Sequence, residues 1–268
     1  MTVGGATRLV GLIGDPVKHS LSPLMQNAAF AAVALDWAYV PLPVKREQLE
    51  EAVAGLQALG FAGANVTIPH KTALVGYCDE LDEVAERAGS VNTLVVRDGR
   101  VLGSSTDGAA VVDLVEAEGA RVLVLGAGGS AQAVATALGD AGAESITVAA
   151  RDAERAHALS VRLRTLFAER EVSSETEWPP SAREATLVVN ATPIRDEALV
   201  EVSPKQQVVD LAYRQDGSDT ALIAAAREAG CELAVDGLQV LIGQGAASFE
   251  RWTGIEAPVP VMRAALSR

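Results

Sequence analysis

Apolar and polar residues follow two different periods in the first part of the chain. Runs of strand length occur at Arg8–Gly14, at Trp37–Val44 and at the start of the stretch Gly63–Lys71. Between them, a Ser-Pro pair precedes the predicted helix Pro23–Val33, and Arg46–Gly60 has helical spacing that ends at a glycine. Strands that alternate with helices predict an α/β unit with a mostly parallel sheet, which binds ligands at the carboxyl ends of its strands.

A hairpin follows this unit. Asn92–Leu102 contains two short apolar runs on either side of Asp98-Gly99, a pair typical of a type I′ turn. The next segment, Gly108–Glu118, has a helical pattern, so Asp107 falls at a predicted helix start. Aspartate is a preferred N-cap, and capping is one explanation of this residue.

A second alternation of strands and helices begins at Arg121. The strand Val122–Leu125 leads through a glycine-rich loop into the Ala-rich helix Ala131–Leu138, and the polar segment Glu175–Glu184 reads as a loop. Further buried strands or strand ends are predicted at Ser145–Ala150, Leu187–Val189, Val208–Leu211 and Val235–Gly237. The last helix, Leu238–Trp252, could return to the first unit.

Composition and length agree with this picture. The chain has 268 residues, of which 49% are hydrophobic and 21% charged, which suits one large globular domain or two ordinary ones. No apolar run approaches the ~20 residues of a membrane span, and the N-terminus lacks the pattern of a signal peptide. Two distant cysteines, Cys78 and Cys231, indicate thiols in a reducing compartment. We therefore expect a cytoplasmic protein without a membrane partner.

The charge narrows the possible ligands. A net charge of −13 argues against nucleic acid or an anionic membrane as partner. With three histidines and two cysteines in the whole chain, we predict no metal site. An anionic small molecule would have to be held by a few local basic residues or by helix N-termini.

The stretch G-A-N-V-T-I-P-H-K holds the first candidate chemistry. Period-two alternation puts the Asn65 and Thr67 side chains on one face of the predicted strand. Pro69 can open a helix, which would place Lys71 in the first turn, where the macrodipole disfavours a cation by roughly 0.3–1 kcal/mol. A lysine in this setting suits proton transfer, and a surface lysine on a surface helix is the alternative.

The stretch K-H-S-L-S-P contains the second group of candidate site residues. In an extended segment, the hydroxyls of Ser20 and Ser22 point the same way, beside the N–H groups that begin a helix. Such a group of donors is suited to a carboxylate. The alternative is that Ser22 only caps the following helix.

The loop Gly126–Ala131, G-A-G-G-S-A, has the context of a dinucleotide fingerprint between a strand and a helix. Gly126 makes the tight turn, Gly128 lets a pyrophosphate approach the backbone, and Ala131 allows close packing of helix and strand. At the end of the next strand, Arg151 and Arg155 are spaced to grip the 2′-phosphate of NADP, whereas Asp152 between them would oppose a phosphate. The alternative is a solvated helix start.

Seven motifs in order now carry a family resemblance: G-D-P-V-K-H-S-L-S-P, N-V-T-I-P-H-K, G-S-V-N-T-L, S-T-D-G, G-A-G-G-S-A, N-A-T-P and G-L-Q-V-L-I-G-Q. Together they resemble shikimate dehydrogenase over almost the whole chain. The resemblance implies a reversible, NADPH-dependent reduction of 3-dehydroshikimate to shikimate, in aromatic amino-acid biosynthesis.

The resemblance also implies roles for residues that match the motifs. Lys71 matches the general acid/base, and Asp107 matches its partner, which orients the ammonium group. Substrate binding is implied for Ser20, Ser22, Asn65, Thr67, Lys71, Asn92, Asp107, Tyr213 and Gln244. Cofactor binding is implied for Gly126, Ala127, Gly128, Gly129, Ser130, Ala131, Arg151, Arg155, Asn190, Thr192 and Gly237.

The implied fold has two domains and small-molecule partners. Residues 1–106 and 237–268 would form a mostly parallel α/β substrate-binding domain, with a C-terminal helix returning to it, and residues 107–236 a Rossmann-type NADP-binding domain. The expected state is a monomer or a homodimer.

Several positions depart from the family's usual motifs. Ser105 stands in place of an asparagine, Gln26 in place of a common histidine, and Val240 in place of a common methionine. The A-R-D sequence, which contains Asp152, replaces the family's N-R-T, and Pro193-Ile194-Arg195 replaces the Gly-Met that usually follows N-A-T in the loop bordering the nicotinamide. Two alternatives follow: a quinate/shikimate dehydrogenase that prefers NAD, and a non-catalytic NADP-binding regulator.

Overall fold

The structure is a computed structural model that describes residues 3–267, and it divides into two compact units. The described residues up to Thr106 and from Ile242 onward form the first unit, and Asp107–Leu241 form the second. The helix α8 (Gly237–Thr253) therefore begins in the second unit and continues into the first. The division falls five residues later than the predicted boundary before Gly237.

The first unit contains a six-stranded sheet in the order β2-β1-β3-β5-β6-β4. The strands β2, β1 and β3 are parallel, whereas β5 pairs antiparallel with both β3 and β6. The predicted hairpin is confirmed, since Asp98 and Gly99 both have positive φ angles, 52° and 72°, as a type I′ turn requires. The strands are β1 (Arg8–Gly14), β2 (Trp37–Pro43), β3 (Gly63–Val66), β4 (Glu80–Leu81), β5 (Thr93–Arg97) and β6 (Arg100–Ser104).

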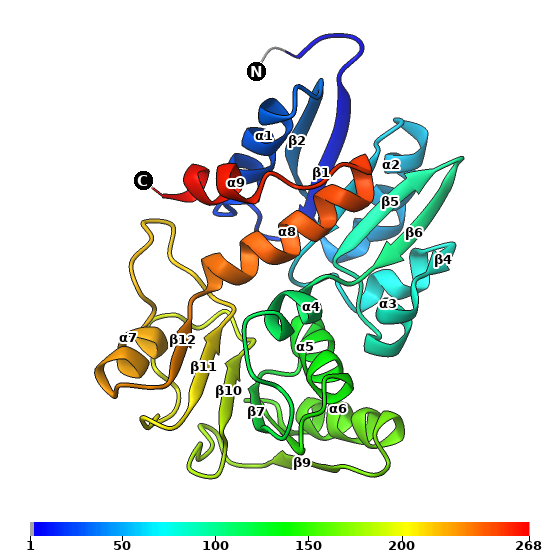
Figure 1. Ribbon diagram of the computed structural model, residues 1–268. Coiled ribbons are helices and arrows are strands. Elements are labelled where there is room, and N and C mark those ends of the chain that lie inside the picture. Colours follow the sequence, from blue (N-terminus) through cyan, green and yellow to red (C-terminus); the bar gives the residue numbers. More distant parts are fainter. Residues whose placement is uncertain (1–2, 268) are drawn as a thin grey trace. The chain divides into compact units, whose positions relative to one another are not determined.

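Helices cover both faces of this sheet (Figure 1). On one face, α2, the 3-10 helix η2 and α3 contribute to a core that includes Leu56, Leu74 and Ile13. On the other face, Phe30 of α1 stacks on Phe249 of α8 with ring centroids 5.3 Å apart. The helical segments of this unit besides α8 are α1 (Ser22–Ala32), η1 (Arg46–Gln48), α2 (Leu49–Ala58), η2 (Ala73–Tyr77), α3 (Glu83–Ala88) and α9 (Val259–Leu266).

The second unit is built on an entirely parallel sheet in the order β12-β11-β10-β7-β8-β9. The chain runs outward from β7 to β9 and then restarts at β10 on the other side of β7. This is the doubly wound Rossmann order, whose ligand crevice lies where the direction reverses, between β7 and β10. The strands are β7 (Arg121–Leu125), β8 (Ser145–Ala149), β9 (Glu171–Glu175), β10 (Leu187–Asn190), β11 (Gln207–Asp210) and β12 (Leu233–Val235).

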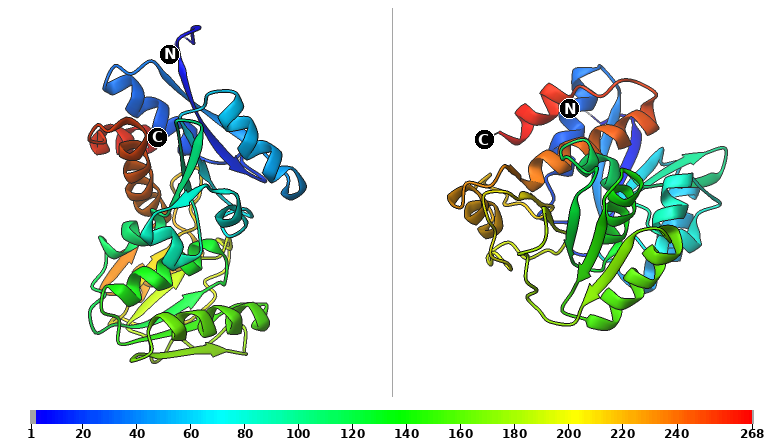
Figure 2. Two further views of the ribbon diagram at one scale, coloured as in Figure 1. Left: turned by 90° about the vertical axis from the view of Figure 1, so that its right-hand side faces the viewer. Right: turned by 60° about the horizontal axis from the view of Figure 1, so that its bottom comes forward.

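Alternate residues of these strands face two separate cores. Val122, Val124 and Val189 pack against α4 (Asp107–Val112), α5 (Gly129–Asp140) and α6 (Ala153–Leu166). Figure 2 shows α5 and α6 alongside each other on one side of this sheet. Leu123 and Val188 face the opposite core, with α7 (Ala221–Glu228). The predicted fold class, α/β with a Rossmann-type domain, is confirmed.

Some predicted element bounds are wrong. The helix expected over Gly108–Glu118 is shorter in the structure, where α4 ends at Val112 and is mostly buried. The strand expected to continue through Thr67 and Ile68 ends at Val66.

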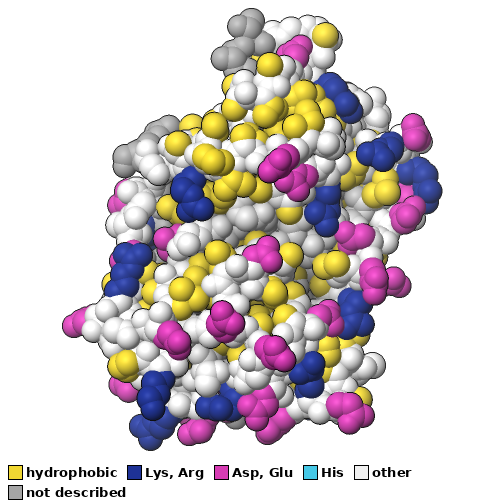
Figure 3. Space-filling view, viewed as in Figure 1, with side chains coloured by type: hydrophobic (Ala, Val, Ile, Leu, Met, Phe, Trp, Pro, Cys, Tyr) yellow, Lys and Arg dark blue, Asp and Glu magenta, His cyan; other side chains and the backbone are white. Residues whose placement is uncertain are grey.

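On the face seen in Figure 3, acidic side chains are interspersed with lysine and arginine. Within residues 3–267, no helix combines the length and apolarity that crossing a membrane would require.

Candidate active site

The segment after β3 is a turn that leads into η2. The N–H of Thr67 donates to Ile13 O at 2.9 Å, and the N–H of His70 donates back to Thr67 O at 3.0 Å. The Ile68–Pro69 peptide bond is cis, and the next helical segment, η2, begins only at Ala73. Lys71 therefore lies in a turn, so the predicted helix start at Pro69 is wrong. The macrodipole argument for Lys71 loses its basis with it.

Hydrogen bonds to Val44 and Val91, which lie just outside β2 and β5, fix this turn instead. His70 is fully buried, and its Nε2 lies 2.7 Å from Val44 O, beyond the end of β2. The carbonyl of Lys71 accepts a hydrogen bond of 2.9 Å from the N–H of Val91. Contacts on both sides of Lys71 thus hold the backbone from which its ammonium group projects.

Thr106, the residue before Asp107, is held by hydrogen bonds to Asn92, which follows Val91 in the chain. Thr106 N donates to Asn92 Oδ1 at 2.9 Å, and Asn92 Nδ2 reaches Thr106 Oγ1 at 2.9 Å. Lys71 and Thr106 are therefore both anchored by two consecutive residues, Val91 and Asn92. Asp107 follows Thr106 as the first residue of α4, and its side chain is buried.

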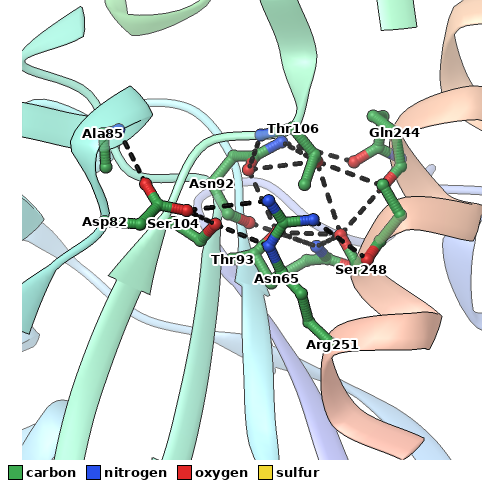
Figure 4. A network of polar contacts seen from close by, with 11 residues as sticks. Asn65, Asp82, Ala85, Asn92, Thr93, Ser104, Thr106, Gln244, Ser248 and Arg251 are labelled. Carbon is green, nitrogen blue, oxygen red and sulfur yellow. Dashed lines mark hydrogen bonds and ion pairs between the residues drawn. The ribbon is translucent and has the colours of Figure 1, made fainter. Parts of the chain in front are cut away.

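Asn65 lies at the centre of a buried polar network in the first unit (Figure 4). Its Oδ1 accepts a hydrogen bond of 2.9 Å from the hydroxyl of Tyr39. Its Nδ2 lies 2.9 Å from Ser248 Oγ and 3.2 Å from Thr93 Oγ1, and also reaches Asn92 O at 3.1 Å. These contacts fix the orientation of the Asn65 amide from both sides.

The same network holds Gln244, which was predicted to bind substrate. Asn92 Nδ2 lies 3.4 Å from Gln244 Oε1, and the hydroxyls of Thr106 and Ser248 donate to Gln244 O at 3.1 and 2.9 Å. Thr93, Thr106, Ser248 and Tyr39 did not emerge from the sequence. The one available signal was the spacing of Gln244 and Ser248, which are four apart on α8 and therefore share a face.

Ser20 and Ser22 are arranged differently from the prediction. Ser22 is the first residue of α1, and the N-cap residue, Leu21, has αR backbone angles and forms no side-chain cap. The segment is therefore not extended, and Ser22 does not cap the helix. Instead, the N–H of Ser22 donates to Ser20 Oγ at 3.2 Å. The two serines remain neighbours at the start of α1, where Gln26, one turn later, donates to Gly245 O at 2.8 Å.

The glycine loop of the second unit has the geometry that the fingerprint predicts. Gly126 has a φ of 114°, and a Cβ there would lie 3.1 Å from Ala191 O, so a side chain would be strained and crowded. Gly128 is the extended N-cap of α5, and a Cβ on it would meet nothing within 4 Å. Ala131 is fully buried against the sheet. An open backbone at a helix N-terminus, beside the switch point, fits the pyrophosphate of a dinucleotide.

Asp152 is the N-cap of α6. Its Oδ1 accepts a hydrogen bond of 3.1 Å from the N–H of Arg155, so the carboxylate is partly neutralised by the helix start. The guanidinium of Arg155 reaches back to Ala127 O in the glycine loop at 3.4 Å. Arg151 and Arg155 are both exposed and able to bind an anion at this place.

Asn190 and Thr192 belong to a loop that the protein holds from within. Asn190 is fully buried, and its Oδ1 accepts hydrogen bonds from the N–H and the hydroxyl of Thr192 at 3.0 and 2.7 Å. The Asn190 amide donates to Asp210 Oδ1 at 2.8 Å and to Ile194 O at 3.1 Å. Asn190 thus shapes the loop, while half-buried Thr192 lies beside Gly126, where its Cγ2 would be 3.3 Å from an added Cβ.

The last two predicted positions lie in the same unit. A Cβ at Gly237, the first residue of α8, would collide with Ala212 O, so this contact requires glycine. Tyr213 is half-buried, and its carbonyl accepts a long hydrogen bond of 3.5 Å from Arg195. Leu211 and Ala212 therefore pack directly against the beginning of α8.

Three family models match this chain. Residues 12–94 match the shikimate dehydrogenase substrate binding domain, residues 109–216 match shikimate/quinate 5-dehydrogenase, and residues 237–266 match the shikimate 5′-dehydrogenase C-terminal domain. The chain belongs to the shikimate dehydrogenase family. The predicted resemblance is thereby confirmed.

Individual relatives and solved structures agree with the assignment to the shikimate dehydrogenase family. Shikimate dehydrogenase (NADP(+)) from Rubrobacter xylanophilus is 44% identical over 99% of this chain and 97% of its own. A crystal structure of a shikimate dehydrogenase in complex with NADP+ has a TM-score of 0.89 at 34% identity, covering 99% of this chain and 96% of its own. Quinate dehydrogenase from Corynebacterium glutamicum, in complex with NAD, has a TM-score of 0.81 at 31% identity, covering 97% and 98%.

Proposed function

We propose that this protein reduces 3-dehydroshikimate to shikimate with NADPH, reversibly, as a step of aromatic amino-acid biosynthesis. Curated relatives that match almost the whole chain are named for this NADP-dependent activity. The observation that carries the proposal is the common anchoring of Lys71 and Thr106 by Val91 and Asn92. It fixes the backbone beside both residues that match the family's catalytic pair.

Lys71 acts as the general acid in this proposal. NADPH, when bound, supplies a hydride to the carbonyl carbon, and negative charge grows on the carbonyl oxygen. The Lys71 ammonium donates a proton to that oxygen, and in the oxidation direction the neutral amine takes the proton back. Asp107 orients the ammonium group and holds a neighbouring substrate hydroxyl.

The remaining first-unit residues bind the substrate. Ser20 and Ser22, at the start of α1, take the carboxylate, and Tyr213 of the second unit matches a family residue that binds the same group. Asn65, Thr67, Asn92 and Gln244 recognise hydroxyls and the carboxylate. The network of Figure 4 supports this assignment, because hydrogen bonds within the protein orient the side chains of Asn65, Asn92 and Gln244. Amides that are already oriented lose less entropy when they bind a substrate.

The glycine loop and two arginines bind NADP. The backbone N–H groups at the α5 N-terminus, with open space beside Gly128, hold the pyrophosphate, and Arg151 and Arg155 pair with the 2′-phosphate. Gly126, Ala127, Gly129, Ser130, Ala131, Asn190, Thr192 and Gly237 complete the cofactor site. We further propose a cytoplasmic monomer or homodimer.

A specific observation favours a second candidate function, an NAD-preferring quinate/shikimate dehydrogenase. Asp152 stands between the two arginines, and its carboxylate would repel a 2′-phosphate. A structural neighbour of this chain is a quinate dehydrogenase in complex with NAD. The N-cap hydrogen bond of Asp152 weakens this objection, since the carboxylate is already directed to the helix start.

Initial rates with shikimate and with quinate, each measured with NADP and with NAD, test the proposal. We expect the highest kcat/KM for shikimate with NADP. A higher value for quinate with NAD would replace the proposal by the second candidate. Absence of turnover in all four combinations, with NADP binding retained, would instead indicate a non-catalytic binding protein.

A further inference from the structure

The side chain of Asp210 is a fully buried carboxyl group at the end of β11. Its Oδ1 accepts hydrogen bonds from Asn190 Nδ2 at 2.8 Å and from the N–H of Ala212 at 2.9 Å. Its Oδ2 accepts one from the hydroxyl of Thr220 at 2.5 Å. One carboxyl group therefore joins three separate segments: the loop after β10, the segment after β11 and the start of α7.

Two of these segments border the proposed cofactor site. The loop after β10 contains Thr192, which lies against Gly126 of the glycine loop, and the N–H of Ala191 donates to Leu125 O at 2.8 Å. The segment after β11 contains Ala212, whose carbonyl lies against Gly237. Asp210 is hydrogen-bonded to one predicted cofactor-binding residue, Asn190, which holds Thr192, and to the N–H of Ala212, whose carbonyl lies against Gly237.

The bond to Asn190 determines how the loop after β10 is held. Asn190 uses its amide nitrogen for Asp210 and Ile194 O, which leaves its oxygen for the N–H and hydroxyl of Thr192. A carboxylate at Asp210 accepts but cannot donate, so it fixes which end of the Asn190 amide faces Thr192. Charge-assisted hydrogen bonds are about twice as strong as neutral ones, so the ionised form holds the loop most firmly.

We propose that Asp210 is a positioning residue for the cofactor: its ionised carboxylate orders the loop 190–194 and the segment 211–213 for NADP binding. This inference rests on the proposed function, because it assigns the loop to the NADP site. When Asp210 is ionised, the protein binds NADP more tightly. When Asp210 is protonated, the loop 190–194 is held less firmly and NADP binding is weaker.

The surroundings of Asp210 allow it to titrate in an accessible range. Burial raises its pKa from 3.8 to about 6, against the opposing effect of the hydrogen bonds from Thr220, Ala212 and Asn190. The titratable and charged side chains on the segments packed around it are Arg195, Asp196, Tyr213, Arg214, Asp219 and Asp236. Arg214 pairs with Asp196, Asp219 pairs with Arg227, and Asp236 accepts from the N–H groups of Leu238 and Gln239.

The test compares NADPH affinity in wild type and Asp210→Asn at several pH values, by fluorescence titration without substrate. The ligand's own phosphate also titrates near pH 6, so the informative quantity is the ratio of the two dissociation constants, in which that effect cancels. We expect Asp210→Asn to bind about tenfold more weakly than wild type at pH 8. At pH 5 we expect the ratio to approach one, because protonated aspartic acid resembles the amide.

Thr220→Val and Thr220→Ser serve as a matched pair. Valine removes a hydrogen bond that stabilises the ionised carboxylate of Asp210. As pH is lowered, the loss of NADPH affinity should therefore begin at a higher pH than in wild type. Serine keeps the hydroxyl and should leave that pH unchanged. This pair also tests the inference if Asp210→Asn does not fold.

A ratio that is constant from pH 5 to pH 8, at any value, would overturn the inference, because a purely structural role has no pH-dependent effect on affinity. An unchanged pH dependence in Thr220→Val would overturn it as well. Both results leave the proposed function intact if wild type binds NADPH and turns over 3-dehydroshikimate. Failure of wild type to bind NADPH would overturn the proposed function and the inference together.

Discussion

Replacing Asp210 by asparagine should change how the stability of this protein depends on pH. Burial raises the pKa of Asp210 from 3.8 to about 6 in the folded state, whereas the unfolded chain keeps the ordinary value. Between these two values the folded protein binds more protons than the unfolded one, so the free energy of unfolding falls as pH rises. The contribution of Asp210 is therefore present at low pH and is lost as pH rises through about 6.

The size of the effect follows from the pKa values. At about 1.4 kcal/mol per pKa unit, the whole shift corresponds to about 3 kcal/mol, of which about 2.5 kcal/mol is lost between pH 4 and pH 7. Asp210→Asn cannot titrate and lacks this component. The difference in the free energy of unfolding, wild type minus Asp210→Asn, should therefore decrease by about that amount over this range.

Urea unfolding at pH 4, 5, 6 and 7 measures this difference. Trp178, in the second unit, packs against the core that contains α7 and provides a local fluorescence signal. Asp216→Asn is the control, because hydrogen bonds from Ser218 lower the pKa of this exposed carboxyl. The contribution of Asp216 to the free energy of unfolding is lost as pH falls, whereas that of Asp210 is lost as pH rises. A difference for Asp210→Asn that stays constant or grows with pH would refute the reasoning.

Three further substitutions test separate parts of the site. Ser248→Ala removes an acceptor of the Asn65 amide, so we expect a stability loss of about 1–3 kcal/mol and a raised KM for shikimate; a stability loss with unchanged KM would separate Asn65 from substrate binding. Gly126→Ala places a Cβ at a φ of 114° and 3.1 Å from Ala191 O, and should cost about 1–3 kcal/mol of stability together with NADPH affinity, both measurable by ligand-dependent thermal shift. Arg151→Ala should weaken NADP binding at least about tenfold more than NAD binding in titrations of both, since a charge-assisted pair to the 2′-phosphate is lost; equal weakening would argue against the clamp.

Local signals made the nucleotide loop predictable from the sequence. The fingerprint requires a strand, a glycine turn and a helix in direct succession, and Gly126–Ala131 supplies all three within a few residues. The hairpin at Asp98-Gly99 was predictable for the same reason, because two adjacent residues with positive φ define the turn. Such features depend little on the rest of the chain.

The region around Lys71 was not predictable in detail. Proline followed by a short polar stretch resembles a helix start, but hydrogen bonds from Thr67 to Ile13 and from Val91 to Lys71 hold the segment as a turn. Ser248 was missed because its partners Asn65 and Thr93 lie 183 and 155 positions away in the sequence. The helix at Asp107 ended early, since tertiary packing and not propensity decides the length of a short buried helix.

The most direct test of the proposed function is the turnover number of Lys71→Ala, measured with 3-dehydroshikimate and NADPH, with exposed Lys45→Ala as control. If Lys71 is the general acid, kcat should fall roughly 10²–10⁴-fold while the affinity for NADPH barely changes, and Lys45→Ala should keep wild-type values. Near-normal turnover in Lys71→Ala would remove this lysine from the chemistry and contradict the mechanism.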